Sequence, residues 1–242
     1  MTARLVGVGV GPGDPDLVTV KAVKVLRGAD LVLVPTLDVG AAGRAERTVR
    51  AHIDHERLQR VPFALNERTD RARREAAWDA AGALVAAAFA AGATTVAFAT
   101  IGDPNVYSSF SYLAATVRGL VPGVEVSTVP GITAMQQLAA ATGVPLVEGE
   151  ETLTLYPLTA GLQGYREALR RSDCVVAYKG GRHLPGVVEV LRERGRLDAA
   201  VVGTDLGLPG QSVVKASDVD ADLPYLSTVL VPPASRTRGG RL

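Results

Sequence analysis

The sequence predicts an α/β fold made of two α/β domains, at residues 1–147 and 148–242. In the first part, apolar strand-like runs alternate with helical patterns, which is typical of a parallel sheet with helical connections. After Glu148, short strands predominate and helices are fewer, which indicates a second α/β domain with a more mixed sheet. The polar residues 147–151 separate the two patterns, and we place the domain boundary there.

The elements of the first domain follow from hydrophobic periodicity and from the positions of Gly and Pro. Strands are expected at residues 5–10, 31–34, 96–99 and 124–129. Helices are expected at residues 16–27, 71–91, 106–117 and 133–142, with a further helix beginning inside the polar stretch 38–50. Asp14 and Pro15 suit the start of the first helix, because Asp accepts hydrogen bonds from free amides and Pro fits the first turn.

The second domain has shorter elements. Strands are expected at residues 152–156, 174–178, 200–203, 213–215 and 227–231. Helices are expected at residues 164–170 and 184–193. The basic, glycine-containing residues 235–242 are expected to fray.

The composition excludes several classes of protein. The net charge is only +1, so we expect neither a nucleic acid nor a membrane as partner. Cys174 is the only cysteine, which rules out a disulfide framework within the chain and suits a cytoplasmic protein. Residues 80–102 carry no charge, but they are rich in alanine and interrupted by Gly82 and Gly92, so we do not expect a membrane span. The N-terminus shows no export signal.

Three glycine–proline turns each follow an expected strand. They read Gly-Pro-Gly-Asp-Pro at residues 11–15, Gly-Asp-Pro at 102–104 and Val-Pro-Gly-Ile-Thr at 129–133. The carboxyl ends of parallel strands share one edge of a sheet, so the three turns should line one crevice. The spacing argues against a dinucleotide fingerprint, because Pro12 or Asp14 stands where its third glycine is required.

In order and spacing, these turns resemble the three signatures of the tetrapyrrole methylases. The stretch Asn-Val-Tyr-Ser-Ser-Phe-Ser-Tyr-Leu at residues 105–113 and the Glu-Gly-Glu at 148–150 resemble the precorrin-2 C20-methyltransferases of that family. The resemblance implies a ligand cleft between the two domains, a homodimer, S-adenosyl-L-methionine as methyl donor and a reduced tetrapyrrole as acceptor. It also implies a trimethylated, precorrin-3A-type product in corrin ring (cobalamin) biosynthesis, made from precorrin-2 or cobalt-precorrin-2.

The resemblance carries site roles onto matching residues. It implies cofactor contacts at Gly102, Asp103, Val106, Thr133, Ala134, Leu158, Tyr178 and Leu206. It implies that a flexible loop and one aromatic residue face the substrate, namely Gly11, Pro12, Gly13, Asp14 and Tyr107. Arg44 and Arg47 are the preferred anchors for the substrate's carboxylates, because guanidinium groups pair with carboxylates bidentately.

Each of these side chains also has a structural interpretation. Asp103 and Asp14 are suited to cap the helices that follow them, and Tyr107 is suited to half-buried packing. Arg44 and Arg47 equally suit a solvated helix face. The sequence therefore leaves both interpretations open at these positions.

The reaction itself needs little acid–base machinery, because the sulfonium methyl group is already activated. The protein has to align the reactants and exclude water. No catalytic base is identified, and no protein-bound metal is expected, since His52 and His55 lack an evident third ligand.

Three alternatives compete with C20 methylation. They are methylation of another carbon, as in a uroporphyrinogen III methyltransferase, a nicotinamide-dependent oxidoreductase, and a non-enzymatic tetrapyrrole-binding protein. The broken glycine register counts against the oxidoreductase, and the intact turn at residues 102–104 counts against the non-enzymatic protein.

Overall fold

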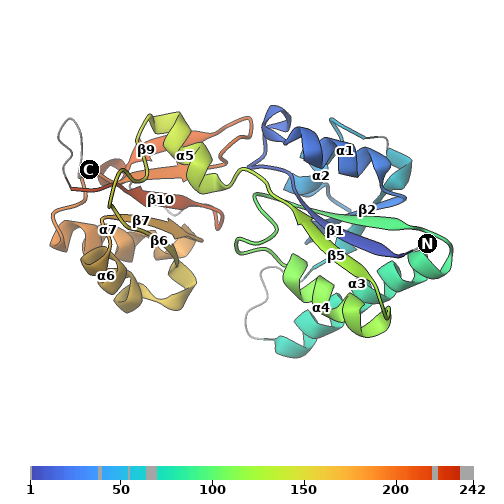
Figure 1. Cartoon of the computed structure of the whole chain (residues 1–242). Helices are drawn as coiled ribbons and strands as arrows, with labels where there is room; N and C mark the ends of the chain where they lie inside the picture. The colour runs from blue at the N-terminus through green and yellow to red at the C-terminus, as the bar shows by residue number, and fades with distance from the viewer. Residues whose placement is uncertain (1, 38–39, 54, 64–69, 220–222, 235–242) are drawn as a thin grey trace. The chain divides into compact units, whose positions relative to one another are not determined.

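The computed structural model describes residues 2–37, 40–53, 55–63, 70–219 and 223–234. The chain forms two compact units, unit 1 (Met1–Thr133) and unit 2 (Ala134–Leu242), each containing one five-stranded sheet with helices (Figure 1). The prediction of two α/β domains is thereby confirmed.

Unit 1 contains a fully parallel sheet in the order β3-β2-β4-β1-β5. Its strands are β1 (Arg4–Gly9), β2 (Leu31–Thr36), β3 (Leu58–Pro62), β4 (Thr95–Thr100) and β5 (Glu125–Val129). Its helices are α1 (Val20–Gly28), α2 (Arg44–Val49), α3 (Arg71–Ala90) and α4 (Phe110–Leu120), with the short 3-10 helices η1 (Pro15–Leu17) and η2 (His55–Arg57).

Both faces of this sheet are covered by helices. Residues of α1 and α2, such as Leu26 and Val49, share one apolar cluster with Val8 of β1. Residues of α3 and α4, such as Val85 and Leu113, share a second cluster with Leu5 on the opposite face of the same strand. Burial on both sides explains why β1 and β4 read as nearly continuous apolar runs.

Unit 2 contains a mixed sheet in the order β6-β7-β10-β8-β9, as the shorter strand patterns predicted. Its strands are β6 (Leu153–Pro157), β7 (Cys174–Tyr178), β8 (Val201–Thr204), β9 (Ser212–Lys215) and β10 (Thr228–Val231). Its helices are α5 (Ala134–Thr142), α6 (Leu162–Arg171) and α7 (Leu184–Glu193), with the 3-10 helices η3 (Leu158–Ala160), η4 (Gly181–His183) and η5 (Ala216–Asp218).

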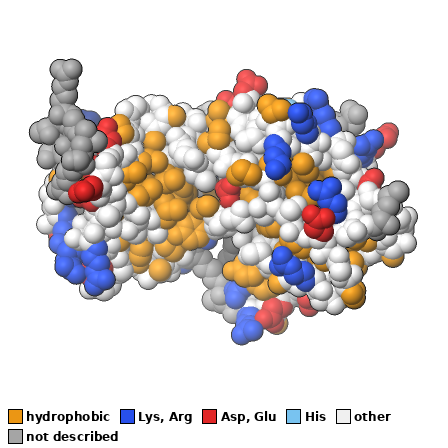
Figure 2. All heavy atoms as spheres, in the orientation of Figure 1, with side chains coloured by type: hydrophobic (Ala, Val, Ile, Leu, Met, Phe, Trp, Pro, Cys, Tyr) orange, Lys and Arg blue, Asp and Glu red, His pale blue; other side chains and the backbone are white. Residues whose placement is uncertain are grey.

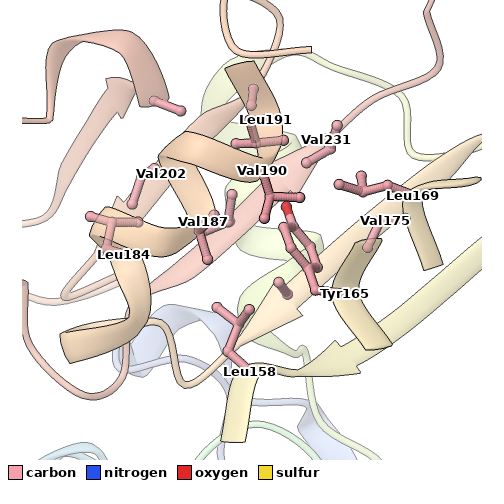
Figure 3. Close-up of a cluster of buried hydrophobic side chains, with 14 residues drawn as sticks. Leu158, Tyr165, Leu169, Val175, Leu184, Val187, Val190, Leu191, Val202 and Val231 are labelled. Carbon is pink, nitrogen blue, oxygen red and sulfur yellow. The ribbon is translucent and has the colours of Figure 1, made fainter. Parts of the chain in front are cut away.

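The two faces of the second sheet pack against different helices. Leu138 of α5 joins Cys174, Val176 and Leu230 in a cluster on one face. The other face packs against α6 and α7, where Tyr165 lies among aliphatic side chains of α7, β7 and β10 (Figure 3). Hydrophobic side chains also gather on the visible surface of unit 2, whereas Lys and Arg are scattered over that of unit 1 (Figure 2).

The units divide between Thr133 and Ala134, earlier than the boundary expected at residues 147–151. Helix α5 accounts for the difference, because it packs against β10 and β9 rather than against the first sheet. The glycine–proline turn at residues 129–133, which precedes α5, belongs to unit 1. The strand, the turn and the helix are continuous in sequence, but the helix lies in the other unit.

Several boundaries differ from the expected ones for local reasons. The first helix begins at Val20 rather than at residue 16, because the Thr19 hydroxyl accepts the Ala22 N–H and caps it. Helix α4 begins at Phe110, after a turn that includes Val106. Strand β2 continues through Pro35 to Thr36, since beyond Leu33 it pairs only with β3, a strand that the sequence patterns missed.

The described ranges contain neither a membrane-spanning helix nor a cluster of potential metal ligands. There, no helix combines the length and the apolar character that crossing a bilayer requires. The same ranges hold no cluster of three or more His, Cys, Asp or Glu side chains placed to bind a metal ion.

Candidate functional site

The three glycine–proline turns of unit 1 lie together, as predicted. They follow β1, β4 and β5, which are neighbours in the sheet. The Gly102 N–H donates to the Gly11 carbonyl at 2.8 Å, which joins the first two turns. The Gly131 N–H donates to the Asp103 carboxylate at 3.0 Å, which joins the second turn to the third.

Glycine is required where these turns meet. A Cβ on Gly131 would lie 2.1 Å from the Gly102 carbonyl oxygen, and one on Gly9 would lie 2.6 Å from the same atom. Real Cβ atoms do not approach a backbone oxygen so closely. The carboxyl edge of the sheet therefore presents backbone rather than side chains at this point.

Asp103 is a structural link between two turns. Its carboxylate is buried, with one oxygen accepting the Asn105 N–H at 2.8 Å and the other accepting the Gly131 N–H at 3.0 Å. It does not cap α4, since that helix begins at Phe110, so the helix-cap interpretation is wrong. A carboxylate has about four acceptor positions, so these two bonds leave capacity for a cationic ligand.

The other predicted cofactor residues of unit 1 surround Asp103. The Val106 N–H donates to the Asp103 carbonyl at 3.2 Å, which closes the second turn. Thr133 is buried and lies close to Gly102, because a Cβ added to Gly102 would be 3.9 Å from the Thr133 Cα. The structure thus brings Gly102, Asp103, Val106 and Thr133 together.

Tyr107 follows the same turn in a strained conformation. Its φ of 51° lies in the left-handed region, which non-glycine residues adopt rarely and mostly at functional sites. Its side chain is half exposed, and partial burial raises the pKa of its hydroxyl. A pocket of about 510 Å³ opens beside it, with Ser108, Tyr112, Arg118 and Thr128 also in its lining.

The loop at residues 11–17 is anchored rather than flexible, contrary to expectation. Besides the bond to the Gly11 carbonyl, the Gly13 carbonyl accepts the Thr48 hydroxyl at 3.0 Å. The Pro15 carbonyl lies 3.0 Å from His52 Nε2, which must therefore carry a proton. Gly11, Pro12 and Gly13 are all buried.

Asp14 caps a different element from the one expected. Its side chain accepts the Asp16 N–H at 2.9 Å and so caps the 3-10 helix η1, while Thr19 caps α1. The side chain is half-buried. The bond occupies one of its acceptor positions and leaves others for a ligand.

Arg44 and Arg47 lie on α2, whose Thr48 contacts the first glycine turn. Arg44 is half-buried, whereas Arg47 is exposed and donates to the Ala42 carbonyl at 3.2 Å. The same helix carries a buried charge that the sequence patterns missed. Glu46 is fully buried, and Arg60 and Arg50 each donate to its carboxylate at 2.7 Å.

The predicted residues of unit 2 follow strands that run in one direction. Strand β10 is antiparallel to both β7 and β8, and β6 is parallel to β7, so the carboxyl ends of β6, β7 and β8 share an edge. Leu158, Tyr178 and Leu206 lie at these ends. The Tyr178 hydroxyl accepts the Met135 N–H at 3.2 Å, which ties β7 to the start of α5, beside Ala134.

Leu158 does not supply the apolar wall that the resemblance implied. The whole residue is buried, and its side chain packs in the core formed with α6 and α7 (Figure 3). Leu206 is also largely buried, and it packs in the cluster that contains Leu138. Tyr178 is only partly buried.

Two further residues at this edge were not predicted. Lys179 (φ 62°) and Asp205 (φ 48°) adopt the left-handed conformation directly after β7 and β8. They adjoin Tyr178 and Leu206 in sequence. Strained non-glycine backbone tends to gather at ligand sites, so this edge of unit 2 is a candidate site in its own right. The sequence patterns did not reveal it, because Lys does not favour positive φ and Asp, although enriched there, is common in ordinary turns.

Several known proteins are similar to this chain in sequence or in fold. The precorrin-2 C(20)-methyltransferase of a Sinorhizobium species is 36% identical over 240 residues, which cover 95% of each chain. The cobalt-precorrin-2 C(20)-methyltransferase of Salmonella typhimurium is 29% identical over 235 residues, covering 96% of this chain and 97% of its own. The structure of a cobalamin synthesis related protein, CobF, from Corynebacterium diphtheriae is similar with a TM-score of 0.74 at 19% identity, covering 97% of this chain and all of its own.

A comparison with protein families covers most of the chain. The model of the tetrapyrrole (corrin/porphyrin) methylases matches residues 4–220, which include all three turns and both sheets apart from β10. The chain therefore belongs to the tetrapyrrole methylases.

Proposed function

We propose that this chain transfers a methyl group from S-adenosyl-L-methionine to C20 of precorrin-2 or of cobalt-precorrin-2. The observation that carries the proposal is the 36% identity to a precorrin-2 C(20)-methyltransferase along nearly the whole of both chains. The second candidate is methylation of a different tetrapyrrole carbon. The stretch at residues 105–113 favours C20, because it resembles the C20 enzymes rather than the uroporphyrinogen enzymes.

The residues at the carboxyl edge of unit 1 fit a methyl donor. Gly9, Gly102 and Gly131 let the backbones of the three turns pack against one another, and the Asp103 carboxylate beside them retains acceptor positions for an ammonium group. S-adenosyl-L-methionine, when bound, supplies a methyl group activated by a sulfonium. We propose cofactor contacts at Gly102, Asp103, Val106 and Thr133 in unit 1, and at Ala134, Leu158, Tyr178 and Leu206 in unit 2.

The substrate is proposed to face the anchored loop. The proposed substrate-facing residues are Gly11, Pro12, Gly13 and Asp14, which bring few side chains to a broad, flat macrocycle, and of these Asp14 is half-buried while the other three are buried. Tyr107 and the arginines Arg44 and Arg47 on α2 are proposed to contact its periphery, the arginines by pairing with acetate and propionate groups. These residues hold and orient the acceptor, and the turns limit the access of water to the reacting carbon.

We also propose that the protein acts as a homodimer in the cytoplasm. The family resemblance supports the dimer, and light scattering after size-exclusion chromatography would measure it directly. The sole cysteine, Cys174, is buried and forms no disulfide, which is compatible with a reducing compartment.

The decisive experiment is anaerobic incubation of the protein with labelled S-adenosyl-L-methionine and either precorrin-2 or cobalt-precorrin-2. Mass spectrometry counts the added methyl groups, and carbon NMR locates them. A single methyl group at C20 is the expected result, and the faster acceptor identifies the natural substrate. Methylation elsewhere would favour the second candidate, and no transfer to either acceptor would refute the proposal.

A further inference from the structure

A side chain outside the loop fixes the orientation of the peptide between Gly13 and Asp14. Glycine permits both orientations of the peptide that follows it, so the loop by itself leaves this direction undetermined. Gly13 has a φ of 155°, and its carbonyl accepts the Thr48 hydroxyl at 3.0 Å. The side chain of Thr48 therefore determines which way this peptide points.

Thr48 is firmly placed for this task. It is fully buried on α2, and the neighbouring Glu46 fastens that helix to Arg60 of β3. The Thr48 hydroxyl also lies 3.3 Å from the Arg44 carbonyl of its own helix, but it carries a single proton. The shorter distance assigns that proton to the Gly13 carbonyl.

The orientation of this peptide also sets the direction of the Asp14 N–H. In a trans peptide the C=O and N–H groups point in opposite directions, so the Asp14 N–H is directed away from Thr48. Across the described residues, no hydrogen bond uses this N–H, although the carbonyls of Gly11, Gly13 and Pro15 are all engaged. The loop is held by its acceptors, and this donor is left for a ligand.

The chemistry around the donor selects its partner. The carboxylates of Asp14 and Asp16 adjoin the same peptide in sequence, and they disfavour an anionic acceptor. A neutral acceptor does not meet this repulsion. In a metal-free tetrapyrrole, the imine-type ring nitrogens are neutral acceptors, whereas in a cobalt complex the metal occupies their lone pairs.

We propose that Thr48 is a positioning residue that directs the Asp14 N–H toward a ring nitrogen of the metal-free tetrapyrrole. This inference rests on the proposed function, since it requires that the loop faces the substrate. It makes Thr48 a determinant of the preference between metal-free and cobalt-containing acceptors, acting entirely through the backbone.

Two variants separate the hydroxyl from the shape of the side chain. Thr48→Val keeps the volume and removes the donor, whereas Thr48→Ser keeps the donor. We expect Thr48→Val to raise the KM for precorrin-2 about threefold to tenfold, the effect of one neutral hydrogen bond. Thr48→Ser should stay within about twofold of the unaltered protein on the same scale. The KM for cobalt-precorrin-2 and the Kd for S-adenosyl-L-methionine should stay unchanged in both variants.

Hydrogen exchange of the peptide that covers residues 11–18 provides a readout independent of turnover. Faster exchange in Thr48→Val than in Thr48→Ser supports the anchoring role. An unchanged KM for precorrin-2, or equal loss in both variants, would overturn the proposal, and an equal rise for both acceptors would overturn the ring-nitrogen partner. If the unaltered protein methylates neither acceptor, the proposed function fails, and equal exchange in both variants would then overturn the anchoring role separately.

Discussion

Replacing Glu46 by Gln should destabilise unit 1 more than any exposed charge substitution. The Glu46 side chain is fully buried, and four guanidinium N–H groups, two from Arg50 and two from Arg60, point at its carboxylate. Gln keeps one oxygen acceptor but places an amide NH₂ against a guanidinium donor. At least one charge-assisted hydrogen bond, worth about 1.5–3 kcal/mol, is lost.

The exposure of Arg50 and Arg60 limits how much stability the Glu46→Gln variant loses. Removing one partner of a fully buried ion pair costs about 3–5 kcal/mol, because the remaining charge is left without solvent. Here the Arg50 and Arg60 side chains are 32% and 28% exposed, so both can recover water. We therefore expect a loss of about 2–3 kcal/mol in the free energy of unfolding.

Urea unfolding followed by tryptophan fluorescence measures this loss in the relevant unit. Trp78 is the only tryptophan, and it stacks on Tyr112 within unit 1 at a centroid distance of 4.4 Å. With a urea dependence of about 1–3 kcal/mol per molar, the midpoint should fall by about 0.7–3 M. Glu75→Gln is the matched control. It breaks an exposed pair with Arg71 and should cost less than about 1 kcal/mol.

The effect should depend on pH in a defined direction. Hydrogen bonds from Arg60 and Arg50 lower the pKa of Glu46 below its usual value of 4.5. Its stabilising contribution is therefore complete above about pH 4.5 and is lost as the pH falls through the lowered pKa. The difference between Glu46→Gln and the unaltered protein should be constant from pH 5 to 8 and should shrink in more acidic solution. A variant that matches Glu75→Gln, or a difference that persists after Glu46 is protonated, would refute this reasoning.

Three further substitutions test the remaining contacts. Asp103→Ala should weaken S-adenosyl-L-methionine binding by about 1–3 kcal/mol in calorimetry, whereas the α3 cap variant Asp70→Ala should not, and equal affinities would remove Asp103 from the site. Gly131→Ala should lower the unfolding free energy of unit 1 by about 1–3 kcal/mol, because its Cβ meets backbone, while Gly119→Ala has open space and should be neutral or stabilising. Tyr165→Phe should leave the unfolding free energy of unit 2 unchanged or raise it by up to about 1 kcal/mol, because the buried hydroxyl has no hydrogen-bond partner among the described residues. Calorimetry measures this change, and a clear loss of stability would indicate an ordered water beside the hydroxyl.

The apolar strands and the glycine–proline turns were predictable because their signals are local. β7 (Cys174–Tyr178) and α7 (Leu184–Glu193) match their predicted bounds, since each is delimited by adjacent polar or turn-forming residues. The meeting of the three turns also followed from the rule that parallel strands share an edge. β3 was missed because its edge position leaves Gln59 and Arg60 in a strand that is only partly apolar.

The contacts that organise the site were not predictable because they join residues far apart in sequence. Glu46 and Arg60 are 14 residues apart in sequence, and Thr48 and Gly13 are 35 residues apart. Nothing in the composition of either segment distinguishes these pairs from solvated side chains. The predicted flexibility of the loop was wrong for the same reason, since its glycines indicate freedom while distant side chains remove it.

In both units, the buried polar residues gather near the proposed ligand contacts. Burying a polar group costs free energy unless it is hydrogen-bonded, so a core retains such groups where they serve a purpose. In unit 1 most of them lie at or after the carboxyl ends of strands or on α2, namely Thr36, Glu46, Thr48, Thr100, Asp103 and Thr133. In unit 2 they lie at the end of β8 and at the start of its antiparallel neighbour β10, which is the same sheet edge, namely Thr204, Ser227 and Thr228. Because this edge also carries the left-handed residues Lys179 and Asp205, the two units present their polar and strained groups at equivalent edges. This arrangement supports the proposed ligand contacts at both edges.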